Sequence, residues 1–386
     1  MPGRVITPFQ SNHLDHLFSG HSRQTTNDIN REIWLIIKSY SDVGSRGRAL
    51  AKKHGCSPAR SNEAWLAFRG YIRAAENYWT AAETTPWQTS PLLYYYCLLN
   101  LVKALLVLKD PDMPRRISHG LSFLPTKRRS AFSKQYVSAP DYGRRKDVFK
   151  DDVDTVYRSF QWQFTGKLGP TKINIVNALA YCYDIGEQYE LSFGPARSVP
   201  FQYRIVSDSS HTWSLLAIQN SANLESYPSI FRQFLRDYEK VDIPPAVPQY
   251  LRDAFGLRLH AWQGYSFYEN RNKTALNPSS WLDYSSDPHN LFGERLGMNV
   301  IDDSNSGFLY LPRNTRDGQI MTEELAIYSV FFFLSSLVRY QPEYIDGLSG
   351  QKAGWVIESF VKTCPSKFLR RYICLLEKQI SVVSHV

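Results

Sequence analysis

One apolar stretch, residues 89–109, constrains the fold of this chain more than any other part of it. Only Asn100 and Lys103 interrupt its apolar residues with strongly polar side chains. Ser90-Pro91 is typical of a helix cap and first turn, and Asp110-Pro111 is typical of a stop. A helix of about 18 residues spans about 27 Å, and one that is apolar nearly all round is buried on most sides. We therefore predict a central core helix.

A membrane span is the competing interpretation, because a span needs about 20 apolar residues. The two polar side chains and three tyrosines inside the stretch favour the core helix. The chain has 386 residues, of which 43% are hydrophobic and 14% aromatic, as in globular proteins rather than disordered ones. It shows no signal peptide, and its five cysteines are scattered without a CxxC pair. We expect a cytoplasmic protein with reduced thiols, no metal and no cofactor.

Further segments show the apolar spacing of helices. They are residues 26–38 with a cap at Asn27 or Asp28, 57–85, 171–189 ending near Gly186, 226–238, 322–340, 352–363 and 366–380. In the first of them, Ile29, Ile33, Leu35 and Ile36 make the apolar stripe. The 322–340 segment is as apolar as the central stretch, so we expect the two helices to pack together and Pro342 to end the second.

Short β-rich runs occupy the middle of the chain. They cover residues 203–207 and 213–219, separated by the turn-rich SDSSHT, and residues 257–270 and 307–312. Residues 271–306 are rich in Asn, Ser, Asp and Pro, which predicts a loop. We therefore expect a mixed insertion with a small antiparallel sheet.

These elements predict an α+β fold that is mainly α-helical, with a buried helical core. The expected segments are an N-terminal arm (1–25), an N-terminal helical layer (26–110), a basic connector (111–150), a helical segment (151–199), the mixed α/β insertion (200–312) and a C-terminal helical block (313–386) that packs on the N-terminal helices.

Positive charge is concentrated in the connector. The chain has a formal net charge of +9, and residues 114–150 hold ten basic against two acidic residues, a net charge of +8. Such a local field attracts polyanions, and the interleaved aromatic residues could stack on unpaired bases. The residues that we expect to bind nucleic acid are Arg115, Arg116, Lys127, Arg128, Arg129, Arg144, Arg145 and Lys146. The alternative is a solvated basic loop.

Two stretches carry a family resemblance. One is SPLLYYYCLLNLVKALL followed by His119-Gly120-Leu121, and the other is LSSLVRYQPEY at residues 334–344. In sequence and order they resemble the signature stretches of the YaaC-like bacterial protein family. The resemblance implies a helix-rich N-terminal part before a mixed middle. It also marks a polar cluster of family positions: Tyr95, Asn100, Lys103, His119, Arg339, Tyr340 and Glu343.

Asn100 and Lys103 stand three residues apart, on one face of the predicted helix. In one interpretation Lys103 extends to solvent and Asn100 bonds a neighbouring loop. In the other, a buried Lys103 pairs with an acid, Glu343 first, because a buried ammonium needs a partner. Such a cluster could join the two apolar helices or bind a ligand.

His119 follows Arg115 and Arg116 closely. His119 as general base and Arg115 as phosphorane stabiliser could serve a metal-independent ribonuclease. HEPN-type ribonucleases place their Arg and His further apart, so the spacing departs from that motif. A structural or phosphate-binding histidine is the alternative. The chain lacks GxxxxGK[ST], GxGxxG, HExxH and GxSxG motifs, which leaves the corresponding enzyme classes without support.

The sequence therefore favours a nucleic-acid-engaging binding protein, with bacterial stress or phage defence (antiviral defence) as its setting. Two alternatives stay open: a HEPN-like ribonuclease, and a protein-interaction scaffold that uses its aromatic surface. The expected partners are DNA or RNA and a protein or second copy of the chain, with no membrane.

Overall fold

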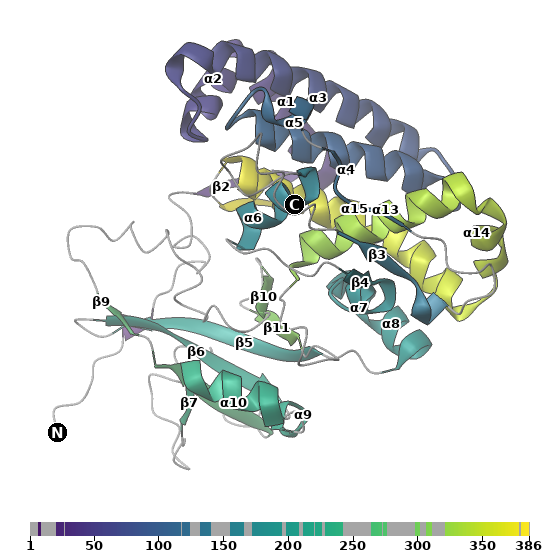
Figure 1. Ribbon diagram of the computed structural model, residues 1–386. Helices are drawn as coiled ribbons and strands as arrows, with labels where there is room; N and C mark the ends of the chain where they lie inside the picture. The colour runs from purple at the N-terminus through teal and green to yellow at the C-terminus, as the bar shows by residue number, and fades with distance from the viewer. Residues whose placement is uncertain are drawn as a thin grey trace, which may run out of the picture. The chain divides into compact units, whose positions relative to one another are not determined.

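The computed structural model has a mainly α-helical α+β fold, as predicted (Figure 1). It describes residues 7–8, 21–26, 28–116, 118–123, 132–139, 155–165, 172–194, 198–207, 211–219, 221–225, 228–241, 264–271, 273–275, 298–301, 306–310, 321–377 and 380–385. The chain divides into two compact units. The helical unit contains Thr25–Ala196, Met321–Glu377 and Val383–Val386, and the sheet unit contains Met1–Gln24, Arg197–Ile320 and Lys378–Val382.

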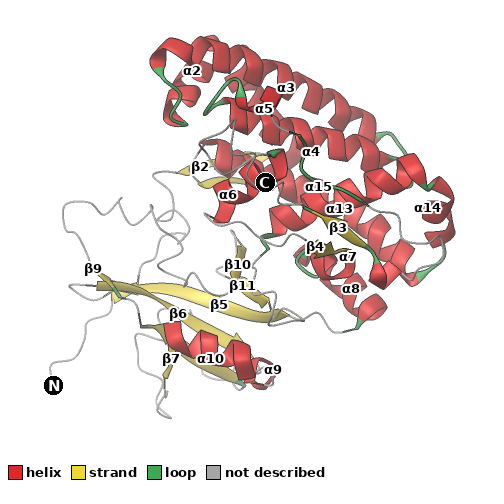
Figure 2. Ribbon diagram, in the orientation of Figure 1, coloured by secondary structure: helices red, strands yellow, loops and turns green. Residues whose placement is uncertain are grey.

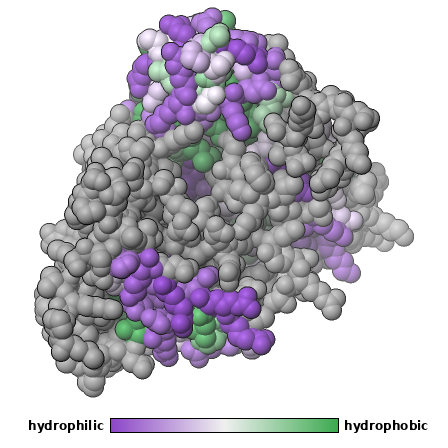
Figure 3. All heavy atoms as spheres, turned by 60° about the vertical axis from the view of Figure 1, so that its left-hand side comes forward, coloured by the Kyte–Doolittle hydropathy of each residue, from purple (hydrophilic) through white to green (hydrophobic). Residues whose placement is uncertain are grey.

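The helical unit is built from long helices that are joined by short ones (Figure 2). Its helices are α1 Ile29–Asp42, α2 Gly44–Lys53, α3 Ser61–Glu83, α4 Ser90–Val107, α5 Met113–Arg116, α6 Val156–Thr165, α7 Ile175–Leu179, α8 Gly186–Phe193, α13 Glu323–Tyr340, α14 Pro342–Leu348 and α15 Lys352–Glu377. A two-stranded sheet, β3 Tyr136–Ser138 and β4 Lys172–Asn174, completes this unit. Hydrophilic side chains predominate at the top of Figure 3, where α1–α3 lie.

The central helix α4 and the apolar helix α13 pack against each other, as predicted. The ring centroids of Tyr94 and Phe331 are 5.5 Å apart, and those of Tyr95 and Phe332 are 5.4 Å apart. Every residue of α13 from Glu323 to Leu337 is buried. Thr322 caps α13 by accepting a hydrogen bond from the Leu325 N–H at 3.5 Å, which satisfies a free donor of the first turn.

α4 is also the one helix among the described residues that is long and apolar enough to cross a membrane. In the structure 67% of it is buried, between α3 and α13 among others. Its N-cap is Thr89 rather than Ser90, which is a buried first-turn residue.

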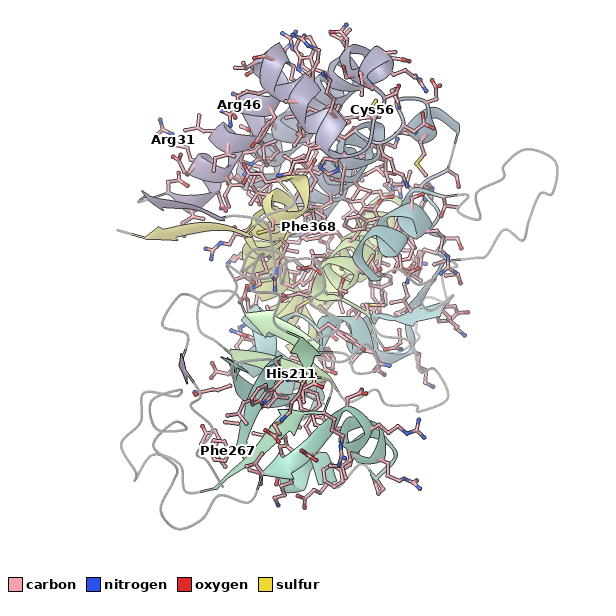
Figure 4. All side chains as sticks on the ribbon, turned by 90° about the vertical axis from the view of Figure 1, so that its left-hand side faces the viewer. Arg31, Arg46, Cys56, His211, Phe267 and Phe368 are labelled. Atoms are coloured by element: carbon pink, nitrogen blue, oxygen red, sulfur yellow. The ribbon has the colours of Figure 1, made fainter. Side chains whose placement is uncertain are left out.

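The C-terminal end of α15 is bound by residues from the first two helices. Lys53 and His54 donate to the carbonyl oxygens of Glu377 and Leu376, the latter at 2.8 Å. The Tyr40 hydroxyl donates to the Glu377 carboxylate at 2.8 Å. Cationic and polar donors at a helix C-terminus satisfy its free carbonyls and complement its dipole. Along the same helix Phe368 lies inside the core, whereas Arg31 and Arg46 project from α1 and α2 (Figure 4).

Eight described strands of the sheet unit form one antiparallel sheet, in the order β10-β11-β5-β6-β8-β7, with β1 also paired to β5 and β9 to β6. They are β1 Thr7–Pro8, β5 Ser198–Ser207, β6 His211–Gln219, β7 Tyr238–Val241, β8 Tyr265–Asn270, β9 Thr274–Ala275, β10 Met298–Ile301 and β11 Ser306–Tyr310. The predicted hairpin is β5–β6, with Tyr203 opposite Leu216. Two helices, α9 Ala222–Glu225 and α10 Pro228–Asp237, follow β6, and Phe234 of α10 packs on Tyr268 of β8.

Two segments far apart in the sequence pair with each other, because β2 His21–Thr26 and β12 Ile380–His385 form a two-stranded sheet. The strands β1 and β2 lie in the predicted N-terminal arm, and β12 begins where a helix was expected to end. The Asp28 side chain caps α1, as predicted, by accepting from the Arg31 N–H at 3.0 Å. Within α1, Leu35 is 50% exposed, and Trp34 and Ile37 take the buried positions instead.

Several predicted boundaries are wrong. Residues 171–189 are not one helix, because Asn174 caps α7 through a hydrogen bond from the Asn177 N–H, and Gly186 begins α8 instead of ending a helix. Residues 352–377 form one helix that contains Pro365, and burial of the residues around this proline outweighs its missing hydrogen bond. The predicted loop 271–306 contains β9 and β10. The sequence did not predict α2 or α14, and residues 257–263 of the predicted strand lie outside the described part of the chain.

Candidate functional site

α4 has one stripe of partly exposed residues on an otherwise buried surface. Tyr96, Asn100 and Lys103 lie along it, spaced by about one helical turn each. The Asn100 amide donates to the Tyr96 carbonyl at 2.7 Å, so it bonds its own helix rather than a neighbouring loop. The Tyr96 ring stacks on Tyr78 of α3, with centroids 5.3 Å apart. The stripe therefore presents Lys103 at its C-terminal end.

Lys103 is half-buried, and its ammonium lies 5.9 Å from the ring centroid of Tyr71 on α3. Burial lowers the pKa of Lys103 below its usual range, because desolvation penalises the charged form. The aromatic face offers the cation only a weak attraction. Glu343 is exposed on α14, and among the described residues no ion pair joins it to Lys103, so the structure does not bear out the predicted pair.

The His119-Gly120-Leu121 motif forms a turn that is fixed to the start of α6. The N–H groups of Val156 and Tyr157 donate to the carbonyls of Ser118 and His119, at 2.8 and 3.2 Å. Gly120 has a φ of 81°, and a Cβ atom there would lie 2.3 Å from the Thr155 hydroxyl oxygen. Only glycine tolerates both the positive φ and this close approach. The motif thus sets the position of His119.

His119 is held in one tautomer. Its Nδ1 accepts a hydrogen bond from the Leu121 N–H at 3.3 Å, so the neutral ring carries its proton on Nε2. One ring face packs on Phe332 of α13, with centroids 5.6 Å apart, while the rest of the residue is exposed. Burial of that face, then the charges of Arg339 and Lys103, lower the pKa of His119 below its usual range. At neutral pH His119 is therefore a neutral Nε2–H donor.

Arg339 comes from the last turn of α13, where the helix leaves the core. Its Nε donates to the Ser335 carbonyl at 3.3 Å, and its guanidinium lies 5.1 Å from the ring centroid of Tyr340. The Arg339 charge acts on both His119 and Tyr95. Because the described part of the chain engages only Nε, the terminal nitrogens remain available as a fork of donors.

Lys103 on α4 and Arg339 on α13 thus both act through their charges on His119, in the loop before α6, and we name the three residues the Lys103–His119–Arg339 cluster. Among the described residues, no ion pair is formed by Lys103 or Arg339. Two cations that act on the same donor without a counter-charge favour a bound anion.

A family model for the YaaC-like Protein family matches residues 40–376. The chain belongs to this family. The match includes both motifs that indicated the resemblance, and it spans α4, the His119 loop and α13. No curated protein and no solved structure shows a significant match.

The seven positions marked by the YaaC-like resemblance divide into two groups. Lys103, His119 and Arg339 meet in the cluster, with Tyr340 beside it and Asn100 one turn from Lys103. Tyr95 instead lies in the core, where its ring packs on Tyr328 and Phe332 and burial raises its pKa. Glu343 lies on the exposed side of α14.

The predicted nucleic-acid-binding residues of the connector are mostly outside the described part of the chain. This applies to Lys127, Arg128, Arg129, Arg144, Arg145 and Lys146. Arg115 and Arg116 form the end of α5, and only their backbone is described. These positions stay predictions.

Two supporting residues were not assigned to the site from the sequence. Phe332 supports the His119 ring, and Tyr71 lies beneath Lys103. The available signal was the spacing of Tyr96, Asn100 and Lys103 along α4, which identifies the exposed stripe but not the residues that other helices bring to it. Within the described residues, no group of three His, Cys, Asp or Glu residues is placed to hold a metal ion.

Proposed function

We propose that this YaaC-like chain binds a nucleic acid through a phosphate group at the Lys103–His119–Arg339 cluster. The observation that supports the proposal is the position of the His119 ring, which packs on Phe332 of α13 where the charges of both Lys103 and Arg339 act on it, with no ion pair to Lys103 or Arg339 among the described residues. The Arg339 fork suits a phosphate, the Lys103 ammonium adds a point charge, and the His119 Nε2–H adds a neutral donor. The charge of the connector favours a polyanionic ligand over an isolated phosphate.

The geometry of His119 favours binding over cleavage. A general base needs an unprotonated nitrogen that faces the substrate, but Nδ1 accepts from the Leu121 N–H and Nε2 carries the proton. His119 can therefore donate to a phosphate without any change of tautomer. The ribonuclease alternative becomes one outcome of the test.

The test compares Lys103→Met, Arg339→Gln and His119→Asn with the unmodified protein. The amide oxygen of the introduced asparagine would replace Nδ1 as acceptor for the Leu121 N–H, so the turn is kept while the Nε2–H donor is removed. Lys109→Met is the matched control, because Lys109 is exposed at the end of the same helix. Binding of a fluorescein-labelled RNA strand, its DNA equivalent and a duplex is followed by anisotropy.

We expect each cluster variant to weaken binding by about tenfold or more, as for the removal of a charge-assisted hydrogen bond, and Lys109→Met to change it less than about twofold. For each phosphate that the protein no longer neutralises, the log–log salt slope should also fall by about 0.7 to 0.9. Replacing Lys127, Arg128 and Arg129 together should flatten the same salt dependence. Equal affinities for the cluster variants and the unmodified protein would refute the proposal. RNA cleavage that disappears in His119→Asn would instead assign the chain to the ribonucleases. If the unmodified protein binds none of these nucleic acids, the protein-interaction scaffold is the remaining function.

A further inference from the structure

The last turn of α13 combines an exposed aromatic ring with the cluster. α13 is buried from Glu323 to Leu337, yet Tyr340 is 68% exposed, the largest exposed fraction among the large hydrophobic residues of the described chain. Its ring contributes little to the core, so burial does not explain an aromatic residue at this position.

The Arg339 guanidinium connects this ring to the cluster. It lies 5.1 Å from the Tyr340 centroid, and its charge also acts on His119. One face of the Tyr340 ring is thus covered by a cation of the phosphate site. The high exposure of Tyr340 leaves the rest of the ring open to a flat, polarisable group.

The other tyrosines near the cluster are less accessible. Tyr95 is 2% exposed, Tyr96 stacks on Tyr78, and Tyr71 lies beneath Lys103. A ligand that places its phosphate at the cluster therefore meets Tyr340 as the exposed aromatic surface among the described residues.

From this arrangement we infer that the site selects a phosphate joined to an unpaired base, with the base stacked on Tyr340. The inference rests on the proposed phosphate site and adds its ligand class, which is single-stranded nucleic acid. Bases of a duplex are stacked inside the double helix and cannot offer a face to Tyr340, whereas every unpaired base can stack on an aromatic ring. Tyr340 is then a binding residue that separates single strands from duplexes, and Lys103 and Arg339 bind both through the phosphate.

The experiment uses the full chain and four fluorescent probes about 12 nucleotides long, within the range that single-strand binding folds cover. They are a single-stranded RNA, the DNA strand of the same sequence, its duplex and an abasic deoxyribose-phosphate strand. A mononucleotide and pyrophosphate serve as competitors. The variants are Tyr340→Ala, Tyr340→Trp and, as the matched control, Trp355→Ala, which removes a 45% exposed aromatic residue from α15.

We expect the unmodified protein to bind the single strands roughly 5- to 150-fold more tightly than the abasic strand, the range expected for one base stacked on an aromatic ring. Tyr340→Ala should abolish this difference and leave abasic-strand and pyrophosphate affinities unchanged. Tyr340→Trp should preserve it, and Trp355→Ala should have no effect. Tyr340 is exposed, so its replacement should leave the fold intact. A thermal unfolding curve of each variant checks this.

Equal affinity of the unmodified protein for the single, duplex and abasic strands would overturn the inference and leave the phosphate site intact. A base-dependent affinity that survives Tyr340→Ala would also overturn it. Failure of the phosphate site itself has a different signature, because Lys103→Met would then leave pyrophosphate and abasic-strand binding unchanged. If the mononucleotide competes as well as an oligonucleotide of equal concentration, the ligand is a nucleotide of the same chemistry and the assignment to strands is overturned.

Discussion

Replacing Lys103 with methionine should stabilise the protein while it weakens anion binding. Lys103 is half-buried, its ammonium faces the Tyr71 ring at 5.9 Å, and burial lowers its pKa. Methionine has a similar length and is apolar, so it fills the same space without a charge to desolvate. The Lys103 side chain is thus expected to favour anion binding and to lower the stability of the fold.

The magnitude follows from the exposure of the group. Replacing fully buried ionic groups with hydrophobic residues has stabilised proteins by about 1–4 kcal/mol. Because Lys103 is only partly buried, we expect a smaller gain of about 0.5–1 kcal/mol, or a rise of about 1–4 °C in Tm for a unit of this size. Urea unfolding followed by tryptophan fluorescence measures this difference, and Lys109→Met controls for the general removal of a positive charge.

The pH dependence gives a second measurement. A lowered pKa means that the folded state penalises the ammonium, and this penalty applies in full below the folded-state pKa. It disappears as the pH rises toward the ordinary value of 10.5, so the advantage of Lys103→Met should shrink between pH 7 and about pH 10. A destabilisation of about 1 kcal/mol or more at pH 7 would refute the reasoning, since Lys103 would then take part in a stabilising ion pair.

Three further outcomes are expected. Anion affinity should rise several-fold as the pH falls toward 5.5, because a bound anion raises the lowered pKa of His119, and calorimetric titrations should show no such rise in His119→Asn. Phe331→Ala should lower the free energy of unfolding by about 3–5 kcal/mol in urea titrations, since this fully buried ring packs between helices. Gly47→Ala should cost about 1–3 kcal/mol by thermal unfolding, because its Cβ would lie 2.1 Å from Trp65, whereas Gly70→Ala has open space and should gain about 0.5–1 kcal/mol.

The two apolar helices were predictable from the sequence because neither has a polar face wide enough to lie against water. That property is local to each helix, so the helix can be predicted without knowing which elements pack against it. The helix through Pro365 was not predictable in the same way. Its continuity depends on the buried contacts of Phe360 and Phe368 on either side, which form only in the folded unit.

The sequence identified the residues of the candidate site but did not predict correctly the pairing of Lys103. The family motifs identified Lys103, His119 and Arg339, whereas the expected partner Glu343 is exposed on α14. Gln341 interrupts the helix with φ −147° and ψ 55°, so residues before and after it no longer share a helical face. A change of direction at one residue is set by packing, and the helical spacing on either side gives no sign of it.

The contacts at the end of α15 have a consequence for biosynthesis. Lys53 and His54 bind carbonyl groups more than 300 positions later in the chain. The partner of α4, α13, is also synthesised late, because most of the sheet unit is encoded between α8 and α13. At translation rates of about 5–20 residues per second, roughly 10–40 s separate the synthesis of α4 from that of its partner. During this interval the α13-facing surface of α4 has no partner, and nascent chains of this protein should be clients of ribosome-associated chaperones.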